Sequence, residues 1–137
     1  MTTLVALANR FETSERPDGN MLDTPGILSQ AIAATSFYSG YAELAVHLAI
    51  AIACPAPIPP TPYPAITGAT EISVSEWAVI RSLFMLYVER ETALQLEASR
   101  GMGIDVFGRS SSEISSDIAL YESDLPHRVF CSVVQSI

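Results

Sequence analysis

The chain has 137 residues, the length of one domain, and a formal net charge of −8. Hydrophobic residues make up 49% and charged residues only 16%, so a domain this small is expected to place part of its apolar surface in an interface. The seven basic residues are all arginines spread along the chain. This pattern disfavours DNA binding, because recognition of phosphates requires clustered cations.

Two short features open the chain. Apolar side chains recur at helical spacing over residues 3–12, which predicts a short amphipathic helix. Pro17, Asp18 and Gly19 then predict a turn, because these residue types favour the backbone angles of a turn. The N-terminal residues have no basic stretch and no cleavage site, so we expect no signal peptide and a cytoplasmic location.

Residues 24–53 form the next predicted helix, with Asp23 or Thr24 as its N-terminal cap. At 1.5 Å per residue such a helix is about 44 Å long. A compact chain of this length has a diameter of roughly 37 Å. We therefore predict that the helix breaks around Ser39-Gly40.

An alternative interpretation of this segment is a small membrane-associated protein inserted through residues 31–54, which are long enough to span a bilayer. Glu43 and His47 in the middle of the segment disfavour insertion, because ionisable groups are costly in hydrocarbon. We therefore expect no membrane partner.

A proline-rich stretch follows this helix. Six of the ten residues from 55 to 64 are prolines, which predicts a stiff polyproline II spacer of roughly 30 Å. We predict a linker over residues 54–70 that separates two long helices.

The second long helix is predicted over residues 73–101. Ser73 and Glu76 have the spacing of a capping box, and a glycine follows the last turn. Between residues 77 and 88 only Arg81 and Ser82 are polar, so the first half of the helix is apolar nearly all the way round. Such a helix must be surrounded, and we expect neighbouring subunits to cover part of it.

Aromatic residues and an arginine on this helix are candidate interface anchors. Trp77, Phe84 and Tyr87 are of the types that dominate interfaces, although aromatics at helical spacing also form ordinary cores. Arg81 lies in the apolar half of the helix, where a buried arginine needs a carboxylate or backbone partner.

A third helix is predicted after a second capping box, Ser110 to Glu113. Its apolar stripe contains Ile114, Ile118, Tyr121 and Leu125.

Pro126 is predicted to interrupt the stripe. Residues 126–137 favour an extended C-terminal arm by composition, with a last helix as the alternative. Four further interface candidates lie in this arm: Val129, Phe130, Val133 and Val134.

Catalytic and metal-binding patterns are weak. Glu89, Glu91 and Glu97 suggest a helical enzyme or metal protein as a further alternative, but no Glu-x-x-His pair accompanies them, and Glu97 with Arg100 has the spacing of a surface ion pair. The histidines and cysteines are isolated in sequence, namely His47, His127, Cys54 and Cys131. We therefore expect no enzyme, no cofactor and no metal site.

Two stretches, YVERETALQLEASRGMG and FGRSSSEISSDIALYE, resemble small helical proteins encoded among the head-assembly genes of tailed bacteriophages. These are the head-to-tail connector, adaptor or collar proteins, and the resemblance covers roughly the C-terminal half of the chain. It implies a structural virion protein without catalytic residues, assembled in the host cytoplasm into a homo-oligomeric ring, commonly of twelve subunits. It further implies that the ring contacts the portal and other neck or tail proteins, with DNA passing through its lumen without specific binding.

The predicted architecture is a single mainly α domain over residues 1–137. It consists of a small bundle of long helices, a rigid Pro-rich linker and an extended C-terminal arm that reaches a neighbouring subunit or ring.

Overall fold

The computed structural model describes residues 1–53, 63–100 and 108–132, and this part of the chain is mainly helical, as predicted. Its helices are α1 (Leu4–Arg10), α2 (Thr24–Ser39), α3 (Ala45–Ala53), α4 (Val74–Ser99) and α5 (Ser111–Ser132). A π-helical turn, η1 (Phe11–Glu15), continues α1. Two short strands, β1 (Thr2–Thr3) and β2 (Glu71–Ile72), pair antiparallel with Thr2 opposite Ile72. Of the predicted linker over residues 54–70, residues 54–62 lie outside the described residues, and residues 63–70 are neither helix nor strand.

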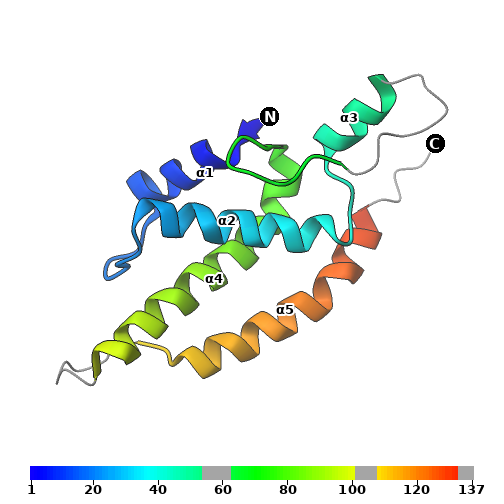
Figure 1. Ribbon diagram of the computed structural model, residues 1–137. Coiled ribbons are helices and arrows are strands. Elements are labelled where there is room, and N and C mark those ends of the chain that lie inside the picture. Colours follow the sequence, from blue (N-terminus) through cyan, green and yellow to red (C-terminus); the bar gives the residue numbers. More distant parts are fainter. Residues whose placement is uncertain (54–62, 101–107, 133–137) are drawn as a thin grey trace.

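Helix α4 is the central element of the fold. It contacts α2 on one side and α5 on the other, and α1 packs on α2 (Figure 1). Its 26 residues span about 39 Å. The predicted capping box is confirmed: the Ser73 hydroxyl accepts from the Glu76 N–H at 3.3 Å, and the Glu76 carboxylate accepts from the Ser73 N–H at 2.8 Å. The central position explains why the first half of α4 is apolar on several sides, since helices of the same chain cover it.

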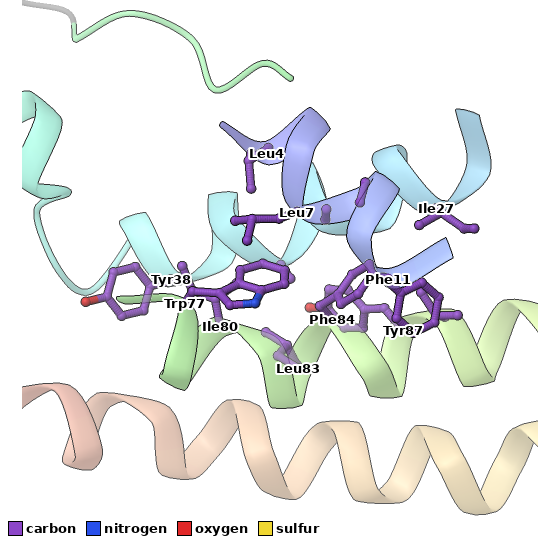
Figure 2. Packing of buried hydrophobic residues seen from close by; sticks show 14 of the residues in the cluster. Leu4, Leu7, Phe11, Ile27, Tyr38, Trp77, Ile80, Leu83, Phe84 and Tyr87 are labelled. Atoms are coloured by element: carbon purple, nitrogen blue, oxygen red, sulfur yellow. The ribbon is translucent and has the colours of Figure 1, made fainter. Parts of the chain in front are cut away.

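The core is concentrated between α4 and the N-terminal helices (Figure 2). The Phe84 ring meets the Phe11 ring edge-on, with centroids 5.1 Å apart, and lies 5.5 Å from the Trp77 ring. Ile80 and Leu83 on the same helix are fully buried. Aromatic pairs of this geometry add stabilisation beyond the area that they bury.

The long segment after Asp23 is broken, as its length predicted. Helix α2 ends at Ser39, the N–H groups of Tyr41 and Ala42 both donate to the Tyr38 carbonyl, and α3 begins only at Ala45. The alternative of one inserted helix over residues 31–54 is therefore not supported. Within the described residues, no helix has both the length and the apolarity required to cross a membrane.

Helix α5 continues through Pro126 to Ser132, so the prediction of an extended arm from residue 126 is wrong for residues 126–132. An interior proline costs a helix about 3 kcal/mol and removes the donor for the carbonyl four residues earlier. Leu125 and Val129 flank it one turn apart and are 0% and 2% exposed, so burial of the stripe offsets the cost. Residues 133–137 lie outside the described part of the chain.

Candidate functional site

An open groove of about 610 Å³ lies where three segments meet, namely the turn after η1, the second half of α4 and the beginning of α5. Val88, Ala93 and Ile114 are buried and form its inner wall, whereas Met21 at its edge is 68% exposed. Further apolar lining comes from α4 and from the segment before α2, and polar side chains line the groove between them; the apolar residues are Met85, Leu96, Phe11 and Pro17, and the polar ones include Asp18, Asn20 and Thr92. Such a lining suits an apolar segment of protein.

One wall of the groove is the predicted turn at residues 17–19, which the structure confirms. Gly19 has a φ of +88°, a conformation that favours glycine. The Arg16 guanidinium holds the turn, because it donates to the Asn20 carbonyl at 2.6 Å and to the Leu22 carbonyl at 2.9 Å. The edge that carries Met21 is therefore fixed from within the chain.

The opposite wall carries a cation that is already paired. The Arg109 guanidinium donates to the Asp117 carboxylate on α5 and lies 3.6 Å from the Glu89 carboxylate on α4. The hydrogen bond with Asp117 raises the pKa of Arg109 above its ordinary value. Because both carboxylates belong to this chain, Arg109 fastens the hairpin of α4 and α5 at the rim of the groove.

The beginning of α5 is held by two caps. The predicted capping box is confirmed by reciprocal 3.3 Å bonds between Ser110 and Glu113. In addition, the Glu97 carboxylate of α4 accepts from the N–H and from the hydroxyl of Ser111, each at 2.8 Å. These bonds hold the pKa of Glu97 below its ordinary value, and the bond from the Ser111 backbone N–H contributes most. The bonded partner of Glu97 is thus Ser111, where the sequence spacing had pointed to Arg100.

The carboxylates of the alternative enzyme or metal site do not converge. Glu89 faces Arg109, Glu91 lies 3.7 Å from Arg90, and Glu97 caps α5. Across residues 1–53, 63–100 and 108–132, no three His, Cys, Asp or Glu side chains gather as a metal site would require.

The two histidines lie in unrelated surroundings. His47 is buried on α3 and stacks on the Tyr63 ring at 4.7 Å, whereas His127 is exposed on α5. The Tyr63 hydroxyl in turn donates to the Glu43 carboxylate at 2.8 Å. This stacking indicates that His47 packs α3 against the segment before β2.

The predicted interface aromatics lie in the core of this chain. Trp77, Phe84 and Tyr87 are 8%, 1% and 7% exposed, which agrees with the alternative that they form ordinary core. The Tyr87 hydroxyl donates to the Glu122 carboxylate of α5 at 2.5 Å. Burial and this bond raise the pKa of Tyr87 well above its ordinary value.

The remaining interface candidates are placed differently from one another. Val129 is buried at 2% exposure, whereas Arg81 is 46% exposed and donates to the Glu15 carboxylate at 3.0 Å. Arg81 therefore has the carboxylate partner that the sequence required, although it is not buried. The Phe130 side chain, Val133 and Val134 lie outside the described residues, so an interface role for them stays a prediction.

The groove itself escaped the sequence analysis. Its residues come from segments that are distant in the chain, and no motif connects them. A local signal exists only for its edge, the Pro-Asp-Gly turn followed by the apolar Met21. Glu76 was likewise recognised only as a cap of its own helix, whereas its carboxylate also accepts from the Ala45 N–H at 2.7 Å and so caps α3.

Comparison of the chain with protein-family models, with curated proteins and with solved structures gives no match. The described residues form a small α-helical protein with an open groove, lined largely by apolar side chains, beside the hairpin of α4 and α5.

Proposed function

We propose that this chain is a structural virion protein that forms an oligomeric ring in the head-to-tail connector, or neck, of a tailed bacteriophage. The observation that carries an assembly role is the groove beside the α4–α5 hairpin. Its inner wall is apolar, and Arg109 at its rim is already bonded to carboxylates of the same chain. A surface of this kind favours a segment of another protein over a charged small molecule.

The phage assignment rests on the resemblance of two sequence stretches, and both fall largely on the hairpin. The first covers the second half of α4, and the second covers the first half of α5. The Tyr87 hydroxyl joins α4 to Glu122 of α5 directly, and Arg109, which precedes α5, pairs with both Glu89 of α4 and Asp117 of α5. These contacts do not involve the N-terminal layer. In this proposal the hairpin forms the wall of the ring.

The acidic character of the chain supports passage of DNA without binding. The net charge is −8, and α5 has four carboxylates, of which Glu113 and Asp124 are exposed. Such a surface repels the phosphate backbone and so lets DNA move past. The proposed partners are further copies of the chain, the portal and other neck or tail proteins, with twelve subunits as the number that the resemblance implies.

The segments beyond the described residues have roles within this proposal. The proline spacing of residues 54–62 favours a rigid spacer between two parts of the subunit, and residues 133–137 supply a short arm toward a neighbour. We expect assembly in the host cytoplasm and retention in the virion.

The test is the mass of the purified chain, alone and with portal rings encoded by the same genome, combined with negative-stain images. We expect one discrete mass, an integer multiple of 14.7 kDa, and images of closed rings with a central opening. A broad mass distribution would indicate non-specific association of apolar surface. A chain that remains monomeric both alone and with portal rings would contradict the proposal.

A further inference from the structure

We infer that residues 133–137 of one copy of the chain dock in the groove of the next copy, so that subunits join head to tail. The inference rests on the proposed ring and names the contact that closes it. It follows from three observations: the lining of the groove, the chemistry of residues 133–137, and the distance between the two.

The groove and the proposed occupant match in chemistry. The groove presents Met21, Met85 and Leu96 around a buried apolar wall. The sequence of residues 133–137 is VVQSI, which has three β-branched apolar residues and no charged side chain. Its side chains require no cation from the groove, and Arg109 at the rim is already paired with Asp117 and Glu89. Burial of aliphatic side chains is therefore the source of affinity.

The groove and residues 133–137 belong to opposite ends of α5. Ile114 in the groove precedes Ser132 by 18 residues of helix, or about 27 Å. Consecutive Cα atoms are 3.8 Å apart, so Val133 and Val134 remain within about 7 Å of Ser132 in any conformation. Even when fully extended, residues 133–137 span at most about 18 Å, which is less than the length of helix between Ser132 and Ile114. They therefore cannot reach the Ile114 end of the groove of their own chain. A second copy can supply them, because the groove is open to the outside.

This geometry determines the type of assembly. Each subunit contributes its groove at one end and residues 133–137 at the other, so the contact joins two different surfaces. Contacts of this heterologous type generate rings when the rotation between subunits closes, and filaments when it does not. The proposed neck ring requires the closed case.

The first experiment alters each side of the contact separately in the full chain. Met21→Asp places a charge at the edge of the groove, and Val134→Asp places one in the docking segment. Leu120→Asp is the matched control, because Leu120 is also 68% exposed but lies on α5 outside the groove lining. We expect both test variants to fall to the 14.7 kDa monomer in light scattering, with unchanged helical circular dichroism, while the control keeps the wild-type mass.

The second experiment mixes the two test variants. Met21→Asp retains its docking segment, and Val134→Asp retains its groove, so one intact junction can form between them. We expect a one-to-one heterodimer of twice 14.7 kDa that grows no further. A mixture that remains monomeric overturns the head-to-tail contact.

The other outcomes separate this inference from the proposed function. If rings survive both substitutions, the inference is overturned and the proposed neck ring stands. The same holds if Met21→Asp leaves the ring intact and abolishes only its binding to the portal. Loss of assembly in the Leu120→Asp control also overturns it, because the effect would then not be specific to the groove. A wild-type chain that is monomeric at every concentration overturns the inference. Rings that need the groove but bind no portal overturn the proposed function alone.

Discussion

Each end of α4 has a glutamate that caps a neighbouring helix, but the two glutamates differ in burial. At its first turn, Glu76 accepts from the N–H of Ala45 and so caps α3; at its last turn, Glu97 accepts from the N–H of Ser111 and so caps α5. The first N–H groups of a helix have no partner within the helix, so a carboxylate from a neighbour satisfies them. Glu76 is 7% exposed, whereas Glu97 is half-buried. From this difference we expect the cap by Glu76 to stabilise the fold more than the cap by Glu97.

The largest effect is expected from Glu76→Gln. Glutamine has one acceptor oxygen and an NH₂ group, so either Ala45 or Ser73 loses the acceptor for its N–H in a buried place. We expect the free energy of unfolding to fall by about 2 kcal/mol, measured by urea denaturation followed by circular dichroism. Glu113→Gln is the control, because Glu113 has the same capping-box position on α5 but is exposed. Equal losses in the two variants would show that burial does not distinguish the caps.

A smaller effect is expected midway along α4. Tyr87→Phe removes the hydroxyl that donates to the Glu122 carboxylate, whereas Tyr121→Phe removes one that donates to the Val79 backbone carbonyl at 2.7 Å. A hydrogen bond to a charged group is worth more than a neutral one, so we expect losses of about 1.5 and about 1 kcal/mol respectively. The measurement is again urea denaturation. The reverse order would contradict a charge-assisted bond between the hairpin helices.

The cap by Glu97 at the end of α4 is expected to make the stability depend on pH. The pKa of Glu97 lies below its ordinary value of 4.5 in the folded state, because Ser111 donates to the ionised form. The stability it contributes is therefore present above pH 4.5 and is lost as the pH falls through the lowered pKa. We expect Glu97→Gln to lower the Tm at pH 7 less than Glu76→Gln does, and to flatten the decrease of Tm below pH 4.5.

A second carboxylate, Glu15, contributes to the same part of the pH profile, and the variant Glu15→Gln measures its share. The pKa of Glu15 is also lowered, chiefly by its bond to Arg81, so Glu15→Gln should flatten the same part of the pH profile. The double variant should flatten it further. An unchanged slope in Glu97→Gln would contradict the cap on α5.

The smallest effect is expected from Arg81→Leu. The Arg81 side chain is 46% exposed, and pairs of this kind contribute about 0.5 kcal/mol, which added salt reduces. A mass measurement on the same variant tests the predicted interface role of Arg81. A loss of several kcal/mol would contradict the exposed position, and an altered oligomeric mass with unchanged stability would assign Arg81 to a subunit contact.

Part of the fold could be predicted because its signals are local. The Ser73 and Ser110 capping boxes depend on residues three apart, and the Pro-Asp-Gly turn depends on three consecutive residues. The break after Ser39 followed from comparing helix length with molecular size. The prediction of an extended arm was wrong for residues 126–132, because a local rule about proline did not include the burial of Leu125 and Val129.

Most of the candidate site could not be predicted. The groove combines Met21 with Ala93 and Ile114, which are far apart in sequence and share no motif. The π-helical turn at Phe11–Glu15, where Phe11 meets the Phe84 ring and Glu15 meets Arg81, has no sequence signal of its own. Its geometry depends on partners on α4.

The sequence by itself determined where α2, α4 and α5 begin and which residues form their apolar faces, because these properties depend on side chains within one turn of each other. Only the tertiary structure decided which apolar faces meet, how Glu76 and Glu97 cap helices other than their own, and that Trp77, Phe84 and Tyr87 are covered by their own chain. The physical reason is that hydrophobic burial has no direction, so a pattern of apolar residues specifies a surface to be covered but not the element that covers it.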